Sequence, residues 1–293
     1  MFHLERILVP IDFSDSSLVA VNHASALARH FHSAITLLHV SEVLVVHPLN
    51  GPLGFGISSG EAERAEHLTR RQKQLDEFGI TELAGVSVKR LLCSGDPAKL
   101  IVQRARDEKS ELILMPTHGH GSFRRFLLGS VTAKVLHDAE CPVWTGTHLA
   151  EMPTLTPADI RHVMCAVNFG PQSLETIRWA AGFASEFGAK LTVIHAVFDN
   201  PPSLPDRYMF HWQDQSHVGA NERLRGLLLD SGIPADALVV SDGDIPRALS
   251  AAAKEKEAGL LVIGRSCAGN MTRRLGTHTY SIICNAPCPV VSI

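Results

Sequence analysis

The sequence lacks the features that mark several special classes of protein. Its 293 residues carry 27 Lys and Arg against 30 Asp and Glu, so no basic excess indicates binding to nucleic acid. No apolar run reaches the length of about eighteen residues that a membrane helix needs, and charges interrupt the apolar stretch at the start of the chain. We therefore expect a cytoplasmic protein with neither a nucleic acid nor a membrane as partner.

The sequence also gives no sign of disulfides, metal sites or a catalytic group. No cysteines form a CxxC pair and several lie in apolar segments, which favours buried thiols (Cys93, Cys141, Cys165, Cys267, Cys284 and Cys288). His118 and His120 form an HxH pair without a third ligand nearby, so we interpret them as part of a polar loop. No Walker lysine is present and Ser130 lacks the flanks of a nucleophile elbow, so we predict no catalytic residue.

The order of apolar segments is typical of an α/β protein. The first half alternates short apolar strands with helices of apolar period: strands over 6–12, 34–40, 86–92, 112–115 and 141–145, and helices that begin near Ser14, Glu61, Asp96 and Ser130. A loop rich in Gly and Pro over 41–60 interrupts the series. In such parallel sheets ligands bind beyond the carboxyl ends of the strands, where Asp12, Val40 and Met115 would meet.

A glycine-bearing turn after the fourth strand is the candidate for ligand binding. Pro116 ends the apolar run, and Gly119 lies in the turn that follows, where the absence of a Cβ atom lets the backbone approach a ligand. Gly129 and Ser130 come ten and eleven residues after Gly119, and we predict that Ser130 caps the next helix. Unpaired N–H groups at a helix N-terminus favour an anion such as phosphate; the alternative is an ordinary strand-to-helix turn.

The second half of the chain repeats the first. Adding 156 to the residue number takes Asp12 to Asn168, and offsets of 148 and 147 match later segments. Residues 147–159 are rich in Pro and Thr and have no apolar period, so we interpret them as a linker. We therefore predict one domain over 1–146 and a second over 160–293.

A set of short motifs gives this repeat a family resemblance. The first half contains in order VPIDFS, LLHV, SGDP, THGHG followed by GS, and ECPV. With this set the whole chain resembles a tandem universal stress protein of the UspA family, each half being one domain. The resemblance implies an α/β fold of two tandem flavodoxin-like (adenine nucleotide alpha hydrolase-like) open parallel five-stranded sheets with helices on both faces. It also implies that the halves pair through their last strands. Further association of whole chains into a homo-oligomer stays open.

The resemblance implies a nucleotide site as well, because ATP-binding members of the family read G-x2-G-x9-G-[ST]. The adenosine of ATP or a related adenine nucleotide, with or without Mg²⁺, would contact Pro10, Asp12 and Val40. The phosphates would contact residues around the motif, namely Met115, His118, Gly119, Gly129, Ser130, Val131 and Thr132.

Both halves depart from that motif. In the first, Pro116 replaces the opening glycine, which removes one N–H group and fixes φ near −65°. In the second, Gly264 is present, but Cys267 replaces the next glycine and Asn168 replaces the aspartate. One residue is also missing before Gly276. We therefore predict that nucleotide binds the first half only and that the second half is a structural partner.

Three functions stay open on the sequence. The first is a non-enzymatic, nucleotide-responsive stress protein in which ATP orders the 41–60 loop and changes an interaction surface. The second is slow ATP hydrolysis or nucleotidyl transfer, because related folds host both. The third is a scaffold that binds no nucleotide. Arg124 and Arg125 either clamp a phosphate, attract acidic partners or form a solvated helix face. His39 and His195 are expected to be structural.

Overall fold

The computed structural model describes most of the chain. The described residues are 2–41, 58–117, 128–146, 155–197, 206–241, 244–265 and 277–293. Several predictions lie outside them: the roles of His118, Gly119 and the arginines at 124 and 125, the interpretation of His120 and Cys267, the altered motif that ends at Gly276, and the ordering of most of the 41–60 loop. Of the predicted linker, residues 155–159 are described, and Pro157–Asp159 form a 3-10 turn.

Each half alternates strands and helices as its apolar periods predict. The first half contains β1 (Arg6–Ile11), α1 (Asp15–Phe31), β2 (Ala34–Ser41), α2 (Ser58–Glu77), β3 (Ser87–Ser94), α3 (Pro97–Asp107), β4 (Leu112–Leu114), α4 (Ser130–Asp138) and β5 (Val143–Thr145). The second contains β6 (His162–Ala166), α5 (Ser173–Glu186), β7 (Lys190–Val197), α6 (Asp206–Ser231), β8 (Asp236–Ser241), α7 (Ile245–Glu255), β9 (Leu260–Ile263), α8 (Thr277–Asn285) and β10 (Val290–Ser292). The predicted α/β fold class is confirmed.

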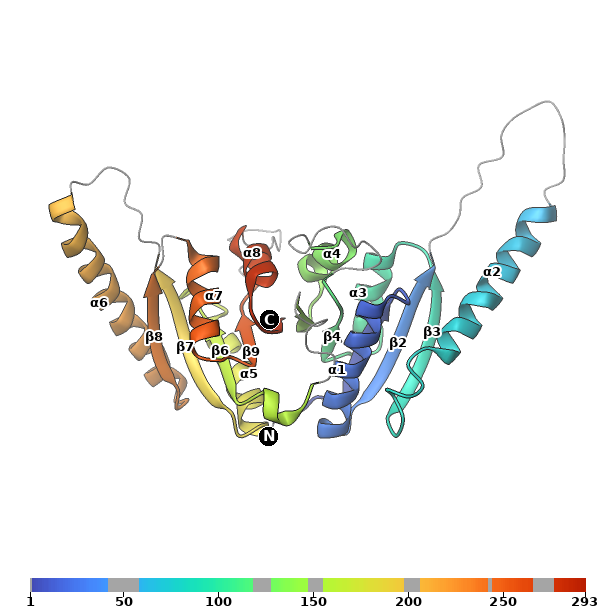
Figure 1. The fold of residues 1–293 in the computed structure, drawn as a ribbon, viewed down its shortest axis with the longest axis horizontal. Coiled ribbons are helices and arrows are strands. Elements are labelled where there is room, and N and C mark those ends of the chain that lie inside the picture. Colours follow the sequence, from blue (N-terminus) through green and yellow to red (C-terminus); the bar gives the residue numbers. More distant parts are fainter. Residues whose placement is uncertain are drawn as a thin grey trace, which may run out of the picture.

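The two halves share one sheet. Its strand order is β3-β2-β1-β4-β5-β10-β9-β6-β7-β8, parallel within each half and antiparallel where β5 meets β10. Val291 pairs with Trp144 in this central register, so the predicted contact between the last strands is present. Each half contributes five strands, as predicted, and the N–H and C=O groups at the edges of β5 and β10 hydrogen-bond to each other, so that the two sheets form one. Figure 1 shows the halves side by side, with α2 and α6 at the outer ends.

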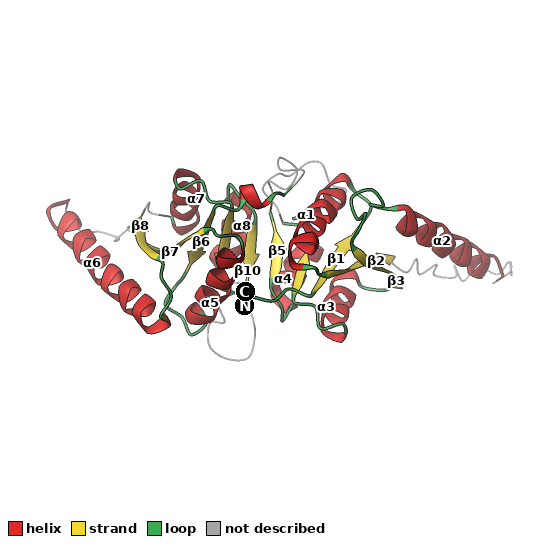
Figure 2. Cartoon of the chain, turned by 90° about the horizontal axis from the view of Figure 1, so that it is seen from below, coloured by secondary structure: helices red, strands yellow, loops and turns green. Residues whose placement is uncertain are grey.

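Helices cover both faces of this sheet (Figure 2). Successive β1 side chains point to opposite faces, so Ile7 and Val9 join one core and Leu8 the other. The first core packs α1, α2, α5 and α6, and the second packs α3, α4, α7 and α8. Both cores contain residues of both halves, so burial joins the halves on each face of the sheet.

Aromatic rings fill the first core where the halves meet. Trp144 is fully buried, with its ring 5.8 Å from that of Phe183 in the other half. Phe2 lies 5.7 Å from Phe31 and 5.8 Å from Phe183. Gly182 makes room for this contact, because a Cβ atom there would lie 2.8 Å from the Phe2 ring.

Among the described residues no helix is both long and apolar enough to cross a membrane.

Candidate functional site

A cavity of about 600 Å³ opens beyond the carboxyl ends of β1, β2 and β4, which we call the N-terminal pocket. The strand order reverses there, since β2 lies on one side of β1 and β4 on the other, and ligands of such sheets bind at this point. Its walls come from three strand ends and from α2, α3 and α4: Pro10, Ile11, Asp12, Ser17, Leu38, His39, Val40, Ser41, His67, Arg71, Pro97, Ile101, Met115, Pro116, Gly129, Ser130, Val131 and Thr132.

The structure brings together every predicted binding residue that it describes. Pro10, Asp12, Val40 and Met115 lie at the strand ends, and the segment 129–132 lies opposite them. These positions are distant in sequence and meet because the carboxyl ends of parallel strands share one edge of the sheet.

Asp12 is held by the first turn of α1. Its Oδ1 atom accepts hydrogen bonds from the backbone N–H of Ser14 at 3.0 Å and from the Ser17 hydroxyl at 2.7 Å. The Ser14 side chain also caps α1 by accepting from the Ser17 N–H group. Charge-assisted bonds of this kind keep the carboxylate oriented at the pocket wall.

The N-terminus of α4 faces the same cavity without a side-chain cap. Gly129, and not Ser130 as predicted, is the N-cap, because its backbone is extended while Ser130 is already helical. The Gly129 N–H donates to the Thr117 carbonyl at 2.8 Å, and the Thr132 hydroxyl donates to the Pro116 carbonyl at 3.1 Å. By contrast, Asp96 caps α3 as predicted. The first N–H groups of α4 have no acceptor within the helix, which suits an anionic ligand.

Helix α2 adds two residues that we did not predict, His67 and Arg71. Their spacing of four puts them on one helix face. This spacing is visible in the sequence, but we interpreted the segment only as an exposed helix. The Arg71 guanidinium lies 5.6 Å from the centre of the Phe13 ring, which lies 4.2 Å from the His39 ring. Phe13 adopts a φ of 66°, an unusual value for a bulky residue, directly after Asp12.

His39 is a satisfied structural histidine, as predicted. Its Nδ1 atom lies 2.9 Å from the Ile11 carbonyl oxygen. Burial lowers the pKa of His39, the nearby Arg71 charge acts in the same direction, and the bond to Ile11 opposes them. The neutral imidazole, with its Nδ1–H donating to Ile11, is therefore the favoured form.

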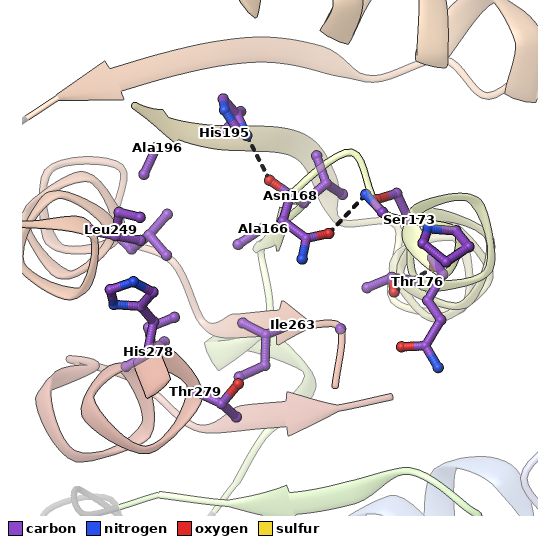
Figure 3. A pocket seen from close by; sticks show the side chains of 17 residues that line it. Ala166, Asn168, Ser173, Thr176, His195, Ala196, Leu249, Ile263, His278 and Thr279 are labelled. Carbon is purple, nitrogen blue, oxygen red and sulfur yellow. Dashed lines mark hydrogen bonds between the residues drawn. The ribbon is translucent and has the colours of Figure 1, made fainter. Parts of the chain in front are cut away.

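The second half contains an equivalent cavity of about 380 Å³, the C-terminal pocket (Figure 3). Part of its lining matches the first pocket: Asn168 takes the place of Asp12, His195 that of His39, and Thr279 that of Thr132. His195 Nδ1 lies 2.8 Å from the Val167 carbonyl, and burial lowers the pKa of His195 as it does for His39.

The two pockets differ in charge. The N-terminal pocket contains Asp12 and Arg71, whereas no Asp, Glu, Lys or Arg is among the described residues that line the C-terminal pocket. Arg223 stacks on Phe169 at 4.4 Å, as Arg71 does on Phe13, but it does not line that cavity.

In the part of the chain that the structure describes, no cluster of three or more His, Cys, Asp or Glu could hold a metal.

Side chains of the second half hold both ends of α4. The Tyr280 hydroxyl accepts from the Leu128 N–H at 2.7 Å, one residue before the N-cap of α4. Arg265 donates to the carbonyl oxygens of Ala139 at 2.8 Å and Cys141 at 2.7 Å, just beyond the C-terminal end of the helix. Tyr280 follows Thr279 and Arg265 follows Gly264, so residues next to the C-terminal pocket position the helix that lines the N-terminal one.

Comparison with known proteins assigns this architecture to a family. The profile of the Universal stress protein family matches the chain twice, over residues 3–145 and 159–293. The chain belongs to the universal stress protein family. A family member from Methanocaldococcus jannaschii is 33% identical over 141 residues, which are 47% of this chain and 79% of that protein. Another, from Mycobacterium tuberculosis strain H37Rv, is 24% identical over 292 residues, 97% of this chain and 95% of its own length.

A solved structure matches both halves of this chain together. The crystal structure of a universal stress protein from Archaeoglobus fulgidus DSM 4304 covers 99% of this chain and 96% of its own, with a TM-score of 0.69 and 22% identity. This likeness supports the fold of both halves together.

Proposed function

We propose that the N-terminal pocket binds ATP or a related adenine nucleotide, one molecule per chain. The observation that carries the proposal is the uncapped N-terminus of α4, which opens on a cavity lined by Asp12 and by the 129–132 segment. These residues match the positions that ATP-binding family members use. The cavity of about 600 Å³ lies within the range of small-molecule sites, roughly 300 to 1,000 Å³.

Each wall of the pocket suits one part of the nucleotide. Pro10 and Val40 offer apolar contact to the adenine, and the Asp12 carboxylate accepts hydrogen bonds from the ribose hydroxyls. The phosphates would lie at the first turn of α4, near Met115, with Mg²⁺ as a companion ion. The predicted contacts to His118 and Gly119 lie outside the described residues. The Arg71 guanidinium, on the α2 wall, adds a positive charge that no residue supplies among the described walls of the C-terminal pocket.

We propose that nucleotide binding at the N-terminal pocket controls how the protein interacts with its partners. Bound ATP would cover the strand ends and change the surface formed by the segments around the pocket. The loop that follows β2 begins at the pocket wall, since Ser41 lines the cavity. We therefore propose a stress-response protein that presents different surfaces in its free and nucleotide-bound forms.

Two measurements test the proposal. Mass spectrometry of ligand released from gently purified protein should detect an adenine nucleotide. Titration calorimetry with Mg-ATP should give a stoichiometry near one, which Gly129→Val abolishes and the matched Gly276→Val leaves unchanged. A stoichiometry of two, or loss of binding in Gly276→Val alone, would contradict the assignment of the nucleotide site to the first half. ADP production above a buffer control would indicate an enzyme instead of a binding protein.

A further inference from the structure

In the second half Asn168 takes the place of Asp12, and the buried hydroxyl equivalent to that of Ser17 has no hydrogen-bond partner among the described residues. In the N-terminal pocket the Ser17 hydroxyl donates to the Asp12 carboxylate at 2.7 Å. The equivalent Ser173 is only 4% exposed, and its Oγ atom has no hydrogen-bond partner among the described residues. A buried polar group costs free energy unless it is hydrogen-bonded, so this hydroxyl is satisfied best by something that enters the pocket.

The Asn168 side chain presents a second donor at the same place. Its Oδ1 atom accepts from the Gly170 N–H at 2.9 Å, which leaves the Nδ2 group as the end that faces the cavity (Figure 3). The Asp12 carboxylate can only accept hydrogen bonds, whereas the Asn168 amide nitrogen can only donate them. The polarity at this point is therefore opposite in the two pockets.

The rest of the C-terminal pocket is mainly apolar. Ala166, Ala196, Ile245, Leu249, Ile263 and Ile282 form much of its wall. A charged ligand would lose its hydration there without gaining an opposite charge from the described walls. The cavity of about 380 Å³ is also smaller than its counterpart.

We propose that the C-terminal pocket binds an uncharged, mainly apolar small molecule that presents a carbonyl oxygen to the Asn168 amide and the Ser173 hydroxyl. The second half is then a second ligand-binding unit of different specificity, and not only a structural partner. This proposal is independent of nucleotide binding in the first half, because its donors and walls all belong to the second half: β6 and the turn after it, α5, β7, α7, β9 and α8.

Methyl NMR of the full chain tests the proposal with acetanilide, an uncharged aromatic amide. Isoleucine methyl groups report each pocket separately: Ile245, Ile263 and Ile282 for the C-terminal pocket, Ile11 and Ile101 for the N-terminal one. We expect acetanilide to shift the first group of signals at millimolar concentration. Propylbenzene, which resembles it in size but has no acceptor, should bind at least several-fold more weakly.

Two variants test the donors themselves. Ser173→Ala should weaken acetanilide binding about 2- to 10-fold, the effect of one lost neutral hydrogen bond. Asn168→Asp should weaken it more, because a carboxylate replaces the donor by an acceptor. Asp12→Asn, the matched change in the first half, should have no effect on the Ile245, Ile263 and Ile282 signals.

Three outcomes would overturn the proposal. Acetanilide could shift only the Ile11 and Ile101 signals or none, propylbenzene could bind as well as acetanilide, or Ser173→Ala and Asn168→Asp could leave binding unchanged. The methyl spectra of each variant without ligand report whether it is folded, so loss of binding is separated from loss of structure.

Discussion

The two pockets of this protein occupy equivalent places in the fold yet present opposite chemistry. Both lie where the strand order reverses. Both contain a histidine bonded to a backbone carbonyl at or just beyond the end of the neighbouring strand, His39 to Ile11 and His195 to Val167. The N-terminal pocket adds a carboxylate and a guanidinium, whereas the described walls of the C-terminal pocket contain no Asp, Glu, Lys or Arg. A repeated backbone thus preserves a cavity, while a few side chains decide which ligand it suits.

The largest expected effect concerns the contact between β5 and β10, where the first half contributes a larger side chain than the second. Trp144 and Val291 pair across it, and both are fully buried. Trp144→Ala should lower the free energy of unfolding by about 3 to 5 kcal/mol, and Val291→Ala by about 2 kcal/mol. Urea denaturation followed by circular dichroism measures both. Equal losses would show that the aromatic cluster around Phe183 adds no stability of its own.

The second prediction tests whether Asp12 in the N-terminal pocket and Asn168 in the C-terminal pocket differ in their importance for ATP binding. Asp12→Ala should weaken Mg-ATP binding about 10- to 100-fold, because it removes charge-assisted hydrogen bonds. The matched Asn168→Ala should leave ATP affinity unchanged. Calorimetry on both variants checks this, with thermal unfolding as a control for the bonds that Asp12 makes to Ser14 and Ser17. Equal weakening by both changes would contradict the proposed asymmetry.

A smaller effect is expected where the second half contacts the first pocket. Tyr280→Phe removes the acceptor of the Leu128 N–H group and should weaken Mg-ATP binding about 2- to 10-fold by loosening the start of α4. His278→Ala, on the same helix, should not change ATP affinity, because no bond joins it to Leu128 among those the structure describes. If both variants bind ATP like the unchanged chain, the Tyr280 contact has only a structural role.

The smallest effect is a pH dependence that the halves should share. Burial lowers the pKa of His39 and His195 below the ordinary 6.5, so the unfolded chain takes up protons that the folded chain does not. Their contribution to stability is therefore complete above pH 6.5 and is lost as the pH falls toward the folded pKa values. Urea denaturation between pH 7.5 and 5.5 should show this decline. His39→Gln and His195→Gln should each reduce it, and an unchanged decline in both variants would contradict the prediction.

Much of the fold was predictable because it depends on local patterns. Alternation of apolar strands with amphipathic helices predicted the α/β class, and the caps Ser14 and Asp96 begin their helices as expected. Ser130 was wrongly predicted as a cap, because a Gly–Ser pair does not reveal which residue has the extended backbone. His67 and Arg71 were missed because a polar helix face gives no sign of the cavity that it borders.

The sequence by itself determined the repeat, the order of elements and the residues that gather at the strand ends, because these follow from side-chain period and from the geometry of parallel sheets. Tertiary structure alone decided that Tyr280 and Arg265 hold the ends of α4, and that Ser173 is buried with no hydrogen-bond partner among the described residues. These features depend on contacts between residues more than a hundred positions apart, or on burial by several elements at once. No local pattern records such contacts, because they arise only when both halves are folded against each other.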